Sequence, residues 1–376
     1  MRIAVCVNTL SAGGAESFCV AIAKEYKKAG HYVMVLIDAI LDIKGHRLEQ
    51  ELKETKIPLI NLNITKNRDK IILPYLYSKV FREHHIDVVH SNLEQSDTYV
   101  ALSKLFYHKP LMVRTLHSKL PFSTYPHFIH KLLFGLYKVN FGCGEDMKNE
   151  YLYEDLREKI YPINNGIEVK TISDEERNFI RNKIREELNL DDDVIIGIQV
   201  GTMSPRFGGI LTKGHDMTFE ALSKISNNNL RLLVVGDCTS RNDSELYNQN
   251  YVHDERIIYY GISSNVNDLI IASDFALAPS RTEGLPITGM EYACLGLPIV
   301  CSSIKQFQVI YSDSVLVFEN GNTEDFVTKL NLILNNISKY KQLAIAQQDN
   351  AQEIFSMKKC CLKYLDKINT LIKSCD

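Results

Sequence analysis

The sequence of 376 residues lacks the cysteine spacings that mark zinc sites and disulfide-rich proteins. Its nine cysteines form no Cys-x-x-Cys pair, and most of them lie within apolar segments. Cysteines in such surroundings are typical of small buried side chains in a reducing compartment. The pattern therefore argues against a zinc centre and against a disulfide framework.

Long apolar runs and an excess of positive charge are also missing. No apolar stretch approaches the roughly 20 residues that a membrane-spanning helix requires. The first residues, Met1–Val5, lead directly into a predicted strand and lack the longer apolar region of a signal peptide. The formal net charge of −3 and the pI of about 6.4 give no overall sign of nucleic-acid binding. We therefore expect a cytoplasmic protein that binds no nucleic acid and is at most peripheral to the plasma membrane.

Acidic residues are absent from Tyr99 to Gly144. The segment carries lysine, arginine and histidine side chains with aromatic residues between them. A basic and aromatic surface favours anionic lipid headgroups or a diphosphate-linked acceptor. We therefore predict contact with an anionic membrane surface through residues 99–144. The alternative is that the aromatic side chains fill the core and that the lysines are ordinary solvent-exposed residues.

Predicted strands and helices alternate along most of the chain. Continuous apolar runs such as Ile3–Val7 and Leu111–Leu116 predict central strands of a parallel sheet, and segments with helical spacing such as Ala15–Lys28 predict the helices between them. The alternation stops at a cluster of Pro, Asn and Gly in Tyr161–Ile167 and starts again at Val194–Val200. This arrangement is typical of α/β proteins with doubly wound sheets. We therefore predict two Rossmann-like domains that face a cleft.

Two carboxylates lie on either side of a predicted helix start in the stretch Pro279–Val300. Glu283 precedes the helix and Glu291 lies inside it, so at most about 12 Å separates them at 1.5 Å per helical residue. That distance is too long for a general acid and base acting on one bond, but it suits a nucleotide sugar, with hydroxyl groups at both ends and phosphates between them. The alternative is a buried glutamate that caps a helix. Backbone groups at the helix start favour an anion, and the residues expected there are Gly284, Leu285, Pro286 and Ile287.

A glycine-rich loop follows the first predicted strand of each half. Gly13 and Gly14 come after the first strand of the chain, where paired glycines allow a ligand to approach the backbone closely. They lack the third glycine of the Gly-x-Gly-x-x-Gly motif, and a tight turn is the structural alternative. The matching loop of the second half, Gly201–Gly214, offers Arg206 and Lys213. Two cations beside helix N–H groups would neutralise a diphosphate leaving group, whereas a lone lysine at a helix start is usually only solvated.

Histidines end two predicted strands of the first half. His117 follows the strand Leu111–Leu116, and His90 ends a shorter strand. Because the carboxyl ends of parallel strands line the ligand crevice, a histidine there can hydrogen-bond a sugar hydroxyl or a phosphate. A structural histidine bonded to the backbone is the alternative, and the case for His90 is the weaker one.

Taken together, these residues resemble glycosyltransferase family 4, a retaining family with the two-domain GT-B fold. Glu283 to Glu291 resembles its Glu-x7-Glu motif, and Thr9–Glu16 its Gly-Gly-Ala-Glu loop. Asn165–Glu168 resembles the Asn-Gly-Ile-Asp that opens the second domain, and Lys213-Gly214 the Lys-Gly after its first strand. The resemblance covers nearly the whole chain. It implies an acceptor-side domain of residues 1–165, a nucleotide-sugar-binding domain of residues 166–345, and a C-terminal helix in residues 346–376 that packs back on the first domain.

The resemblance also implies roles for residues of the second half. Glu283 would hold hydroxyl groups of the donor sugar, and Glu291 the hydroxyl groups of the ribose. Arg206 and Lys213 would bind the diphosphate, so that neither a metal ion nor another cofactor is needed. The family often has an arginine where this chain has Thr202, which makes Arg206 the candidate for its replacement.

The first half would supply Gly13, Gly14 and His117, which face the sugar and the acceptor. The implied activity is hexosyl or N-acetylhexosaminyl transfer from a nucleoside-diphosphate sugar, first of all a UDP-sugar, to a glycan or polyprenyl-linked acceptor in bacterial surface polysaccharide synthesis. A nucleotide-sugar 2-epimerase shares this architecture, and a noncatalytic binding module with the same fold is a third alternative. The Gly-Gly-Ala-Glu loop and the basic aromatic segment favour the transferase.

Overall fold

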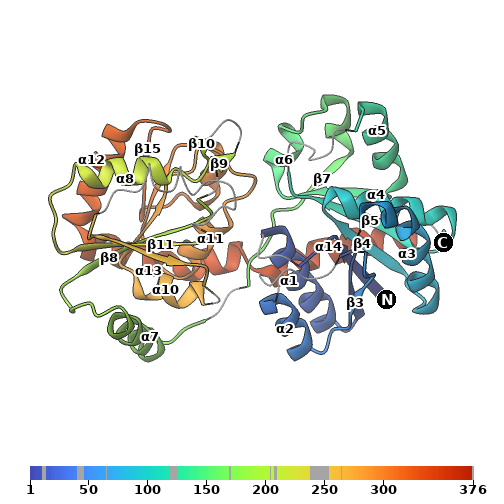
Figure 1. The fold of residues 1–376 in the computed structure, drawn as a ribbon, viewed down its shortest axis with the longest axis horizontal. Helices are drawn as coiled ribbons and strands as arrows, with labels where there is room; N and C mark the ends of the chain where they lie inside the picture. The colour runs from blue at the N-terminus through green and yellow to red at the C-terminus, as the bar shows by residue number, and fades with distance from the viewer. Residues whose placement is uncertain are drawn as a thin grey trace. The chain divides into compact units, whose positions relative to one another are not determined.

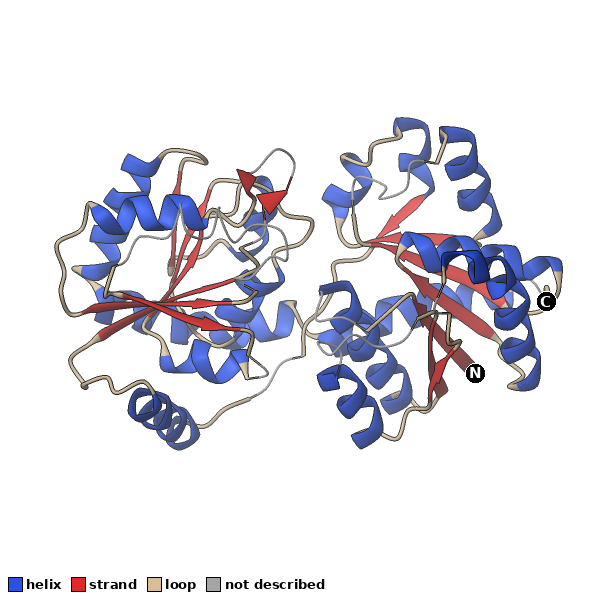
Figure 2. Ribbon diagram, viewed as in Figure 1, coloured by secondary structure: helices blue, strands red, loops and turns tan. Residues whose placement is uncertain are grey.

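The computed structural model describes residues 1–10, 14–39, 46–64, 66–118, 125–168, 171–203, 205–206, 210–237, 254–263 and 265–374. The chain divides into two compact units, Met1–Glu168 with Phe355–Asp376 and Val169–Ile354 (Figure 1). Each unit consists of a parallel sheet with helices packed on it (Figure 2). The prediction of a doubly wound α/β architecture is therefore confirmed.

The first unit is built on a seven-stranded parallel sheet in the order β3-β2-β1-β4-β5-β6-β7. Five consecutive apolar residues of the inner strand β1, Ile3–Val7, are fully buried, as expected for a parallel strand covered on both faces. The chain runs from β1 outward to β3 and returns to β4 on the other side of β1, which makes the carboxyl ends of β1 and β4 the switch point of the sheet. The strands are β1 (Arg2–Val7), β2 (Tyr32–Ile37), β3 (Leu59–Asn61), β4 (Val88–Asn92), β5 (Leu111–Leu116), β6 (Val139–Gly142) and β7 (Ile160–Pro162).

The last helix of the chain belongs to the first unit. α14 (Met357–Lys373) lies beside α1 (Gly14–Lys28), as Figure 1 shows. Its apolar residues recur at helical spacing, which places Tyr364 and Ile368 in the same buried core as Phe18 of α1. The other helical segments of this unit are α2 (His46–Glu54), η2 (Asn67–Ile72), α3 (Leu73–Glu83), α4 (Glu94–Leu102), η3 (Ser103–Leu105), α5 (His127–Leu136), α6 (Glu145–Asn149) and η4 (Glu154–Lys159).

The second unit has a six-stranded parallel sheet in the order β12-β11-β8-β13-β14-β15. The loop expected after β8 contains an antiparallel hairpin of β9 (Pro205–Arg206) and β10 (Ile210–Leu211). A helix expected at 244–250 lies outside the described residues. The sheet strands are β8 (Ile195–Val200), β11 (Leu230–Val235), β12 (Ile257–Gly261), β13 (Phe275–Ala278), β14 (Ile299–Ser302) and β15 (Val315–Phe318). The helices are α7 (Asp174–Glu187), α8 (His215–Ser223), α10 (Val266–Ala272), α11 (Ile287–Cys294), η5 (Lys305–Ile310), α12 (Thr323–Leu334) and α13 (Ile337–Ile354).

The C-terminal boundary of the second unit differs from the sequence-based expectation. The sequence predicts one helix over 352–372 and a domain end at residue 345. Instead, α13 packs against α11 and remains in the second unit up to Ile354. Residues 346–354 therefore belong to the second unit, and the helix is interrupted at Phe355–Ser356 before α14 begins.

The interruption arises because two segments at the edge of the first unit pair with each other. Ile167 N donates to Phe355 O at 2.8 Å, and Met357 N donates to Ile167 O at 2.9 Å. Gly166 lies so close to the start of α14 that a Cβ there would be 2.5 Å from Met357 Cα. The Asn-Gly-Ile-Glu stretch therefore forms a tight junction that has no room for a side chain at its glycine.

Replacement of Gly166 by alanine is expected to lower the free energy of unfolding by about 2–3 kcal/mol, because the added methyl group must push the start of α14 away from the paired segment. Urea unfolding followed by circular dichroism measures the change. Gly135→Ala in α5, where nothing lies within 4 Å of the added Cβ, is the matched control and is expected to leave stability unchanged or slightly raised. Equal unfolding midpoints for the two variants would contradict the prediction.

Candidate active site

Loops of the second unit meet at the carboxyl edge of its sheet. Gly214, which precedes α8, has φ +69° and lies against Pro279 at the end of β13. A Cβ at Gly214 would be 2.1 Å from Pro279 O, so the left-handed backbone and the close approach both require glycine. Ser302 of β14 donates from Oγ to Ser280 O at 2.5 Å. The loops around α8, β13 and β14 are thereby fixed to one another.

Lys213 and Glu283, predicted from two distant stretches of the chain, form one ion pair at this edge. Lys213 Nζ lies 2.6 Å from Glu283 Oε1, and Ser280 Oγ donates to the same oxygen at 2.6 Å. The Glu283 side chain is 10% exposed and the Lys213 side chain 29% exposed, so a ligand can reach the pair. Neither bond uses Oε2, and the described residues supply no other hydrogen bond to that oxygen. Oε2 is therefore available to a ligand hydroxyl.

α11 begins directly after the loop that carries the carboxylate, but its first turn offers fewer backbone donors than expected. Pro286 has no N–H, and Ile287 N donates to Leu285 O at 2.9 Å. The expectation of an unbroken row of donors is therefore wrong at these two positions. Gly284 and Leu285 are the members of the predicted row whose N–H groups can still face an anion.

Tyr292, which the sequence analysis did not single out, ties α11 to the sheet. Its ring is fully buried, and its hydroxyl accepts a hydrogen bond from Val200 N at 2.9 Å. Burial raises the pKa of Tyr292, so the hydroxyl stays protonated around neutral pH. The bond fixes the helix that also carries Glu291, which is half-buried.

Arg281, which the sequence analysis also did not single out, holds the loop segment Leu211–Thr212 that precedes Lys213. Its guanidinium donates to both carboxylate oxygens of Asp216 at 2.7 Å and to Leu211 O at 2.9 Å. Its backbone N donates to Thr212 O at 2.8 Å. The bidentate pair compensates the charge of Arg281, which leaves Lys213 as the cation directed at the carboxylate.

Two of the predicted residues, Arg206 and Gly13, lie partly or wholly outside the described residues. Arg206 belongs to β9, opposite Ile210 in the hairpin, and its side chain lies outside what the structure describes. Gly13 also lies outside the described residues, and Gly14 is the first residue of α1. Thr202 is exposed after β8. The role of Arg206 on the diphosphate therefore stays a prediction.

His117 lies at the carboxyl edge of the first sheet, directly after β5. Asn92 Nδ2 donates to His90 O at 3.3 Å, which directs Asn92 Oδ1 toward His117 Nε2 at 3.0 Å. This pattern assigns the ring proton to Nε2 and leaves Nδ1 as an acceptor. Burial lowers the pKa of His117 to about 4, so the ring is neutral at pH 7. A neutral histidine in this position can accept a hydrogen bond from a hydroxyl group.

His90 is a core histidine, but its partners are side-chain hydroxyls and not the backbone groups of the structural alternative. The ring is fully buried, with Nδ1 3.1 Å from the Tyr26 hydroxyl and Nε2 2.7 Å from Thr115 Oγ1. Burial lowers its pKa to about 3. Because both ring nitrogens have protein partners, His90 has no ring nitrogen left for a ligand.

The basic aromatic segment 99–144 divides between core and surface. Arg114 is buried and pairs with Asp97 at 3.6 Å. Phe128 and Leu132 of α5 are 66% and 56% exposed, so they form an apolar strip on the outside of the helix. Among the described helices, none is both long and apolar enough to cross a bilayer.

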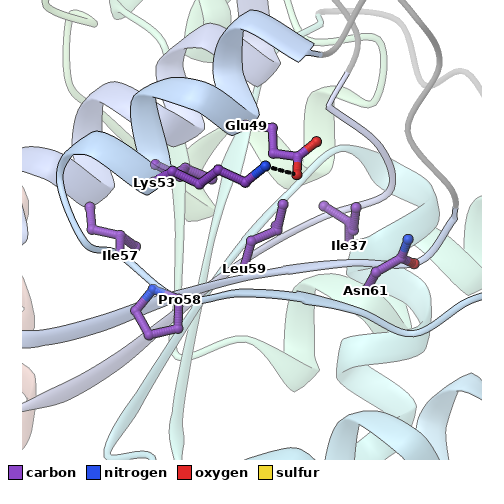
Figure 3. Close-up of a pocket in the computed structure, with 8 residues that line it drawn as sticks. Ile37, Glu49, Lys53, Ile57, Pro58, Leu59 and Asn61 are labelled. Atoms are coloured by element: carbon purple, nitrogen blue, oxygen red, sulfur yellow. Dashed lines mark ion pairs between the residues drawn. The ribbon is translucent and has the colours of Figure 1, made fainter.

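A groove of about 420 Å³ lies between α2 and β3 of the first unit (Figure 3). It is lined by apolar side chains such as Leu52 and Ile57 and by an ion pair between Lys53 and Glu49 at 2.8 Å. No candidate site residue lines it. Within the described ranges, no group of three His, Cys, Asp or Glu side chains is placed to hold a metal ion.

Comparison with known proteins identifies the class. A family profile described as "Glycosyl transferases group 1" matches residues 180–349, and one described as "Glycosyltransferase Family 4" matches residues 12–171. The O-antigen biosynthesis glycosyltransferase WclY of Escherichia coli is 24% identical over 311 residues, 78% of this chain and 82% of that one. The UDP-Gal:alpha-D-GlcNAc-diphosphoundecaprenol alpha-1,3-galactosyltransferase of Escherichia coli is 22% identical over 319 residues, 78% and 79% of the two chains. Anabaena Alr3699/HepE, solved with UDP-glucose, has a TM-score of 0.79 and 17% identity over 98% of this chain and 100% of that one.

The two matched ranges fall on both structural units, and they define the protein as a glycosyltransferase. The chain belongs to glycosyltransferase family 4, and the predicted GT-B fold is confirmed.

Proposed function

We propose that the protein is a retaining, metal-independent transferase that moves a hexosyl or N-acetylhexosaminyl group from a UDP-sugar to a glycan or polyprenyl-linked acceptor in surface polysaccharide synthesis. The contact between Lys213 and Glu283 is the observation that carries this proposal. It joins a cation suited to a diphosphate and a carboxylate suited to sugar hydroxyls at the start of α11. The names of the relatives support the donor and the acceptor class, because one of them uses UDP-galactose and a diphosphoundecaprenol-linked sugar.

The proposed chemistry assigns each charge to a part of the donor. Lys213, with Arg206, stabilises the negative charge that grows on the diphosphate as the glycosidic bond breaks. Glu283 accepts hydrogen bonds from sugar hydroxyls through Oε2, and Glu291 holds the ribose. The acceptor hydroxyl attacks from the face that the diphosphate leaves, with the departing phosphate as the base, so no side-chain nucleophile is required.

The first unit is the acceptor side in this proposal. His117 is neutral at pH 7 and offers Nδ1 to a hydroxyl of the sugar or the acceptor. Gly13 and Gly14 would allow the ligand to approach the start of α1. In this proposal charged side chains are needed only around the donor, because the negative charge grows on its diphosphate leaving group.

The test of the proposed function is a donor panel. The protein is incubated with UDP- and GDP-sugars and a polyprenyl-diphosphate glycan, and the mass gained by the acceptor identifies the transferred sugar. Transfer from a UDP-sugar without added metal, and in the presence of a chelator, is the expected result. Epimerised donor in the absence of acceptor would favour the 2-epimerase instead, and no donor binding by calorimetry would contradict every enzymatic role.

We further propose that the protein works on the cytoplasmic face of the plasma membrane and contacts anionic lipid through segment 99–144. Phe128 and Leu132 supply exposed apolar surface on α5, and Lys109 and Lys138 are exposed cations of the same segment. Apolar anchors next to cations are the combination that binds anionic interfaces.

Flotation with vesicles that contain anionic lipid is expected to recover the protein at low salt and to lose it at high salt. Phe128→Ser with Leu132→Ser should weaken the binding by about tenfold, because two exposed anchors of this size are lost. Ile345→Ser, at a 52% exposed residue of the second unit, is the matched control and should bind like the unmodified protein. Binding that is absent, or insensitive to salt, would rule out the membrane contact without affecting the donor chemistry.

A further inference from the structure

A buried amide side chain lies within one of the two central strands of the second sheet. Gln199 lies in β8, between the apolar residues Ile198 and Val200, and is 1% exposed. β8 pairs with β11 and β13 on its two edges, and the burial of Gln199 keeps its side chain away from water. A buried amide is costly unless its polar atoms are hydrogen-bonded, and its bonds therefore indicate why it is present.

Both polar ends of the Gln199 side chain are used near the candidate active site. Nε2 donates to Lys213 O at 2.9 Å, and Oε1 accepts from Thr218 Oγ1 at 2.7 Å. Thr218 is 1% exposed and lies one turn into α8. The amide therefore joins the sheet, the turn Leu211–Gly214 (the lysine turn) and the first turn of α8 in one buried chain of hydrogen bonds.

The turn around Lys213 is held from two sides. Arg281 bonds to the carbonyls of Leu211 and Thr212, whereas Gln199 bonds to the carbonyl of Lys213 itself. Gly214 adopts a left-handed conformation directly after the lysine, and the Lys213 side chain passes Gly201 so closely that a Cβ there would be 3.1 Å from Lys213 Cγ. Gln199 holds the backbone carbonyl of Lys213, and the Cα of this residue carries the lysine side chain. A shift of this carbonyl therefore moves Nζ relative to Glu283.

We infer that Gln199 is a positioning residue for the proposed transfer. It touches neither donor nor acceptor, and it fixes the backbone of Lys213 so that Nζ is held where the diphosphate charge develops. The inference rests on the proposed function of Lys213. A loss of position of this kind lowers the rate of the chemical step, because the stabilising charge is no longer pre-organised.

The test is a double-mutant cycle between Gln199→Met and Lys213→Ala, measured as kcat and donor KM at a temperature where circular dichroism shows all variants folded. Gln199→Met keeps the length of the side chain and removes both hydrogen bonds. It is expected to lower kcat by about tenfold and to change KM by less than about twofold, as loss of a transition-state contact does. In the Lys213→Ala background the same substitution should change kcat by less than about twofold, because the group that it positions is already missing.

Two further variants keep the test decisive. Thr218→Val leaves the bond from Gln199 to the lysine turn in place, and it is expected to lower kcat only by about threefold, again only when Lys213 is present. It replaces Gln199→Met in the cycle if that variant does not fold. Ser273→Ala removes a different buried hydrogen bond of the same unit, from Ser273 Oγ to Leu269 O at 2.7 Å, and should leave kcat unchanged.

The outcomes separate this inference from the proposed function. Equal fractional losses of kcat with and without Lys213 would overturn the positioning role and leave a purely structural amide. If Lys213→Ala itself leaves kcat unchanged, the proposed function of the lysine fails and the role of Gln199 fails with it.

Discussion

Replacement of Glu283 by alanine is expected to lower sugar transfer by at least about a hundredfold while the protein stays folded. The substitution removes Oε2, the oxygen available for a sugar hydroxyl, and it removes the anion that holds Lys213 Nζ at 2.6 Å. Both effects weaken the donor site at the same time. The loss should appear in kcat/KM for the UDP-sugar identified by the donor panel.

Graded variants separate the two contributions of the carboxylate. Glu283→Gln keeps an oxygen that can accept from Ser280 Oγ but loses the ion pair, so its activity should fall between those of the unmodified protein and the alanine variant. Ser280→Ala removes only the supporting bond and should cost about tenfold or less. Residual activity of the alanine variant within about tenfold, equivalent to roughly 1.4 kcal/mol of barrier, would remove the sugar-binding role from Glu283.

Stability is the necessary control for this prediction. Glu283 lies in a loop before α11, and its removal leaves the bond from Ser302 to the Ser280 backbone intact. The free energy of unfolding is therefore expected to change by no more than about 1 kcal/mol. Urea unfolding of the alanine variant checks this, and a larger loss would assign part of the activity change to misfolding.

The sheets could be predicted because their strands are buried on both faces. β5 begins and ends at the predicted residues, since an uninterrupted apolar run marks a central parallel strand. The hairpin of β9 and β10 could not be predicted, because strands of two residues carry no periodic pattern. The interruption at Phe355 was missed for another reason. It depends on pairing with Ile167, which is far away in the sequence.

The sequence nominates candidate site residues one by one, but it does not predict how they are arranged. Lys213 and Glu283 stand out by residue type at loops after strands, yet their contact depends on the pairing of β8 with β13. His90 and His117 both end predicted strands, but β4 continues to Asn92, so His90 lies inside the strand as a core residue. Gln199 had a readable signal, a polar residue inside an apolar strand, which periodicity alone does not interpret.

Replacement of Lys213 by alanine is the second large effect, and it should act mainly on kcat. In the structure the ammonium group is paired with Glu283, so donor binding exchanges one anionic partner for another and gains little net energy in the ground state. The charge on the leaving diphosphate then grows as the glycosidic bond breaks, and the lysine is worth more in the transition state. We therefore expect kcat to fall by about a hundredfold and KM for the donor to change by less than about threefold.

Lys213→Arg is the matched control because it keeps the charge and changes the shape. The lysine stem passes Gly201 closely, and the broader guanidinium cannot follow the same path without moving one of the two loops. Its kcat should therefore lie between those of the alanine variant and the unmodified protein. Steady-state kinetics with the identified UDP-sugar measure all three proteins. A change confined to KM would show that Lys213 binds donor and transition state equally, and the assignment of leaving-group stabilisation would then be wrong.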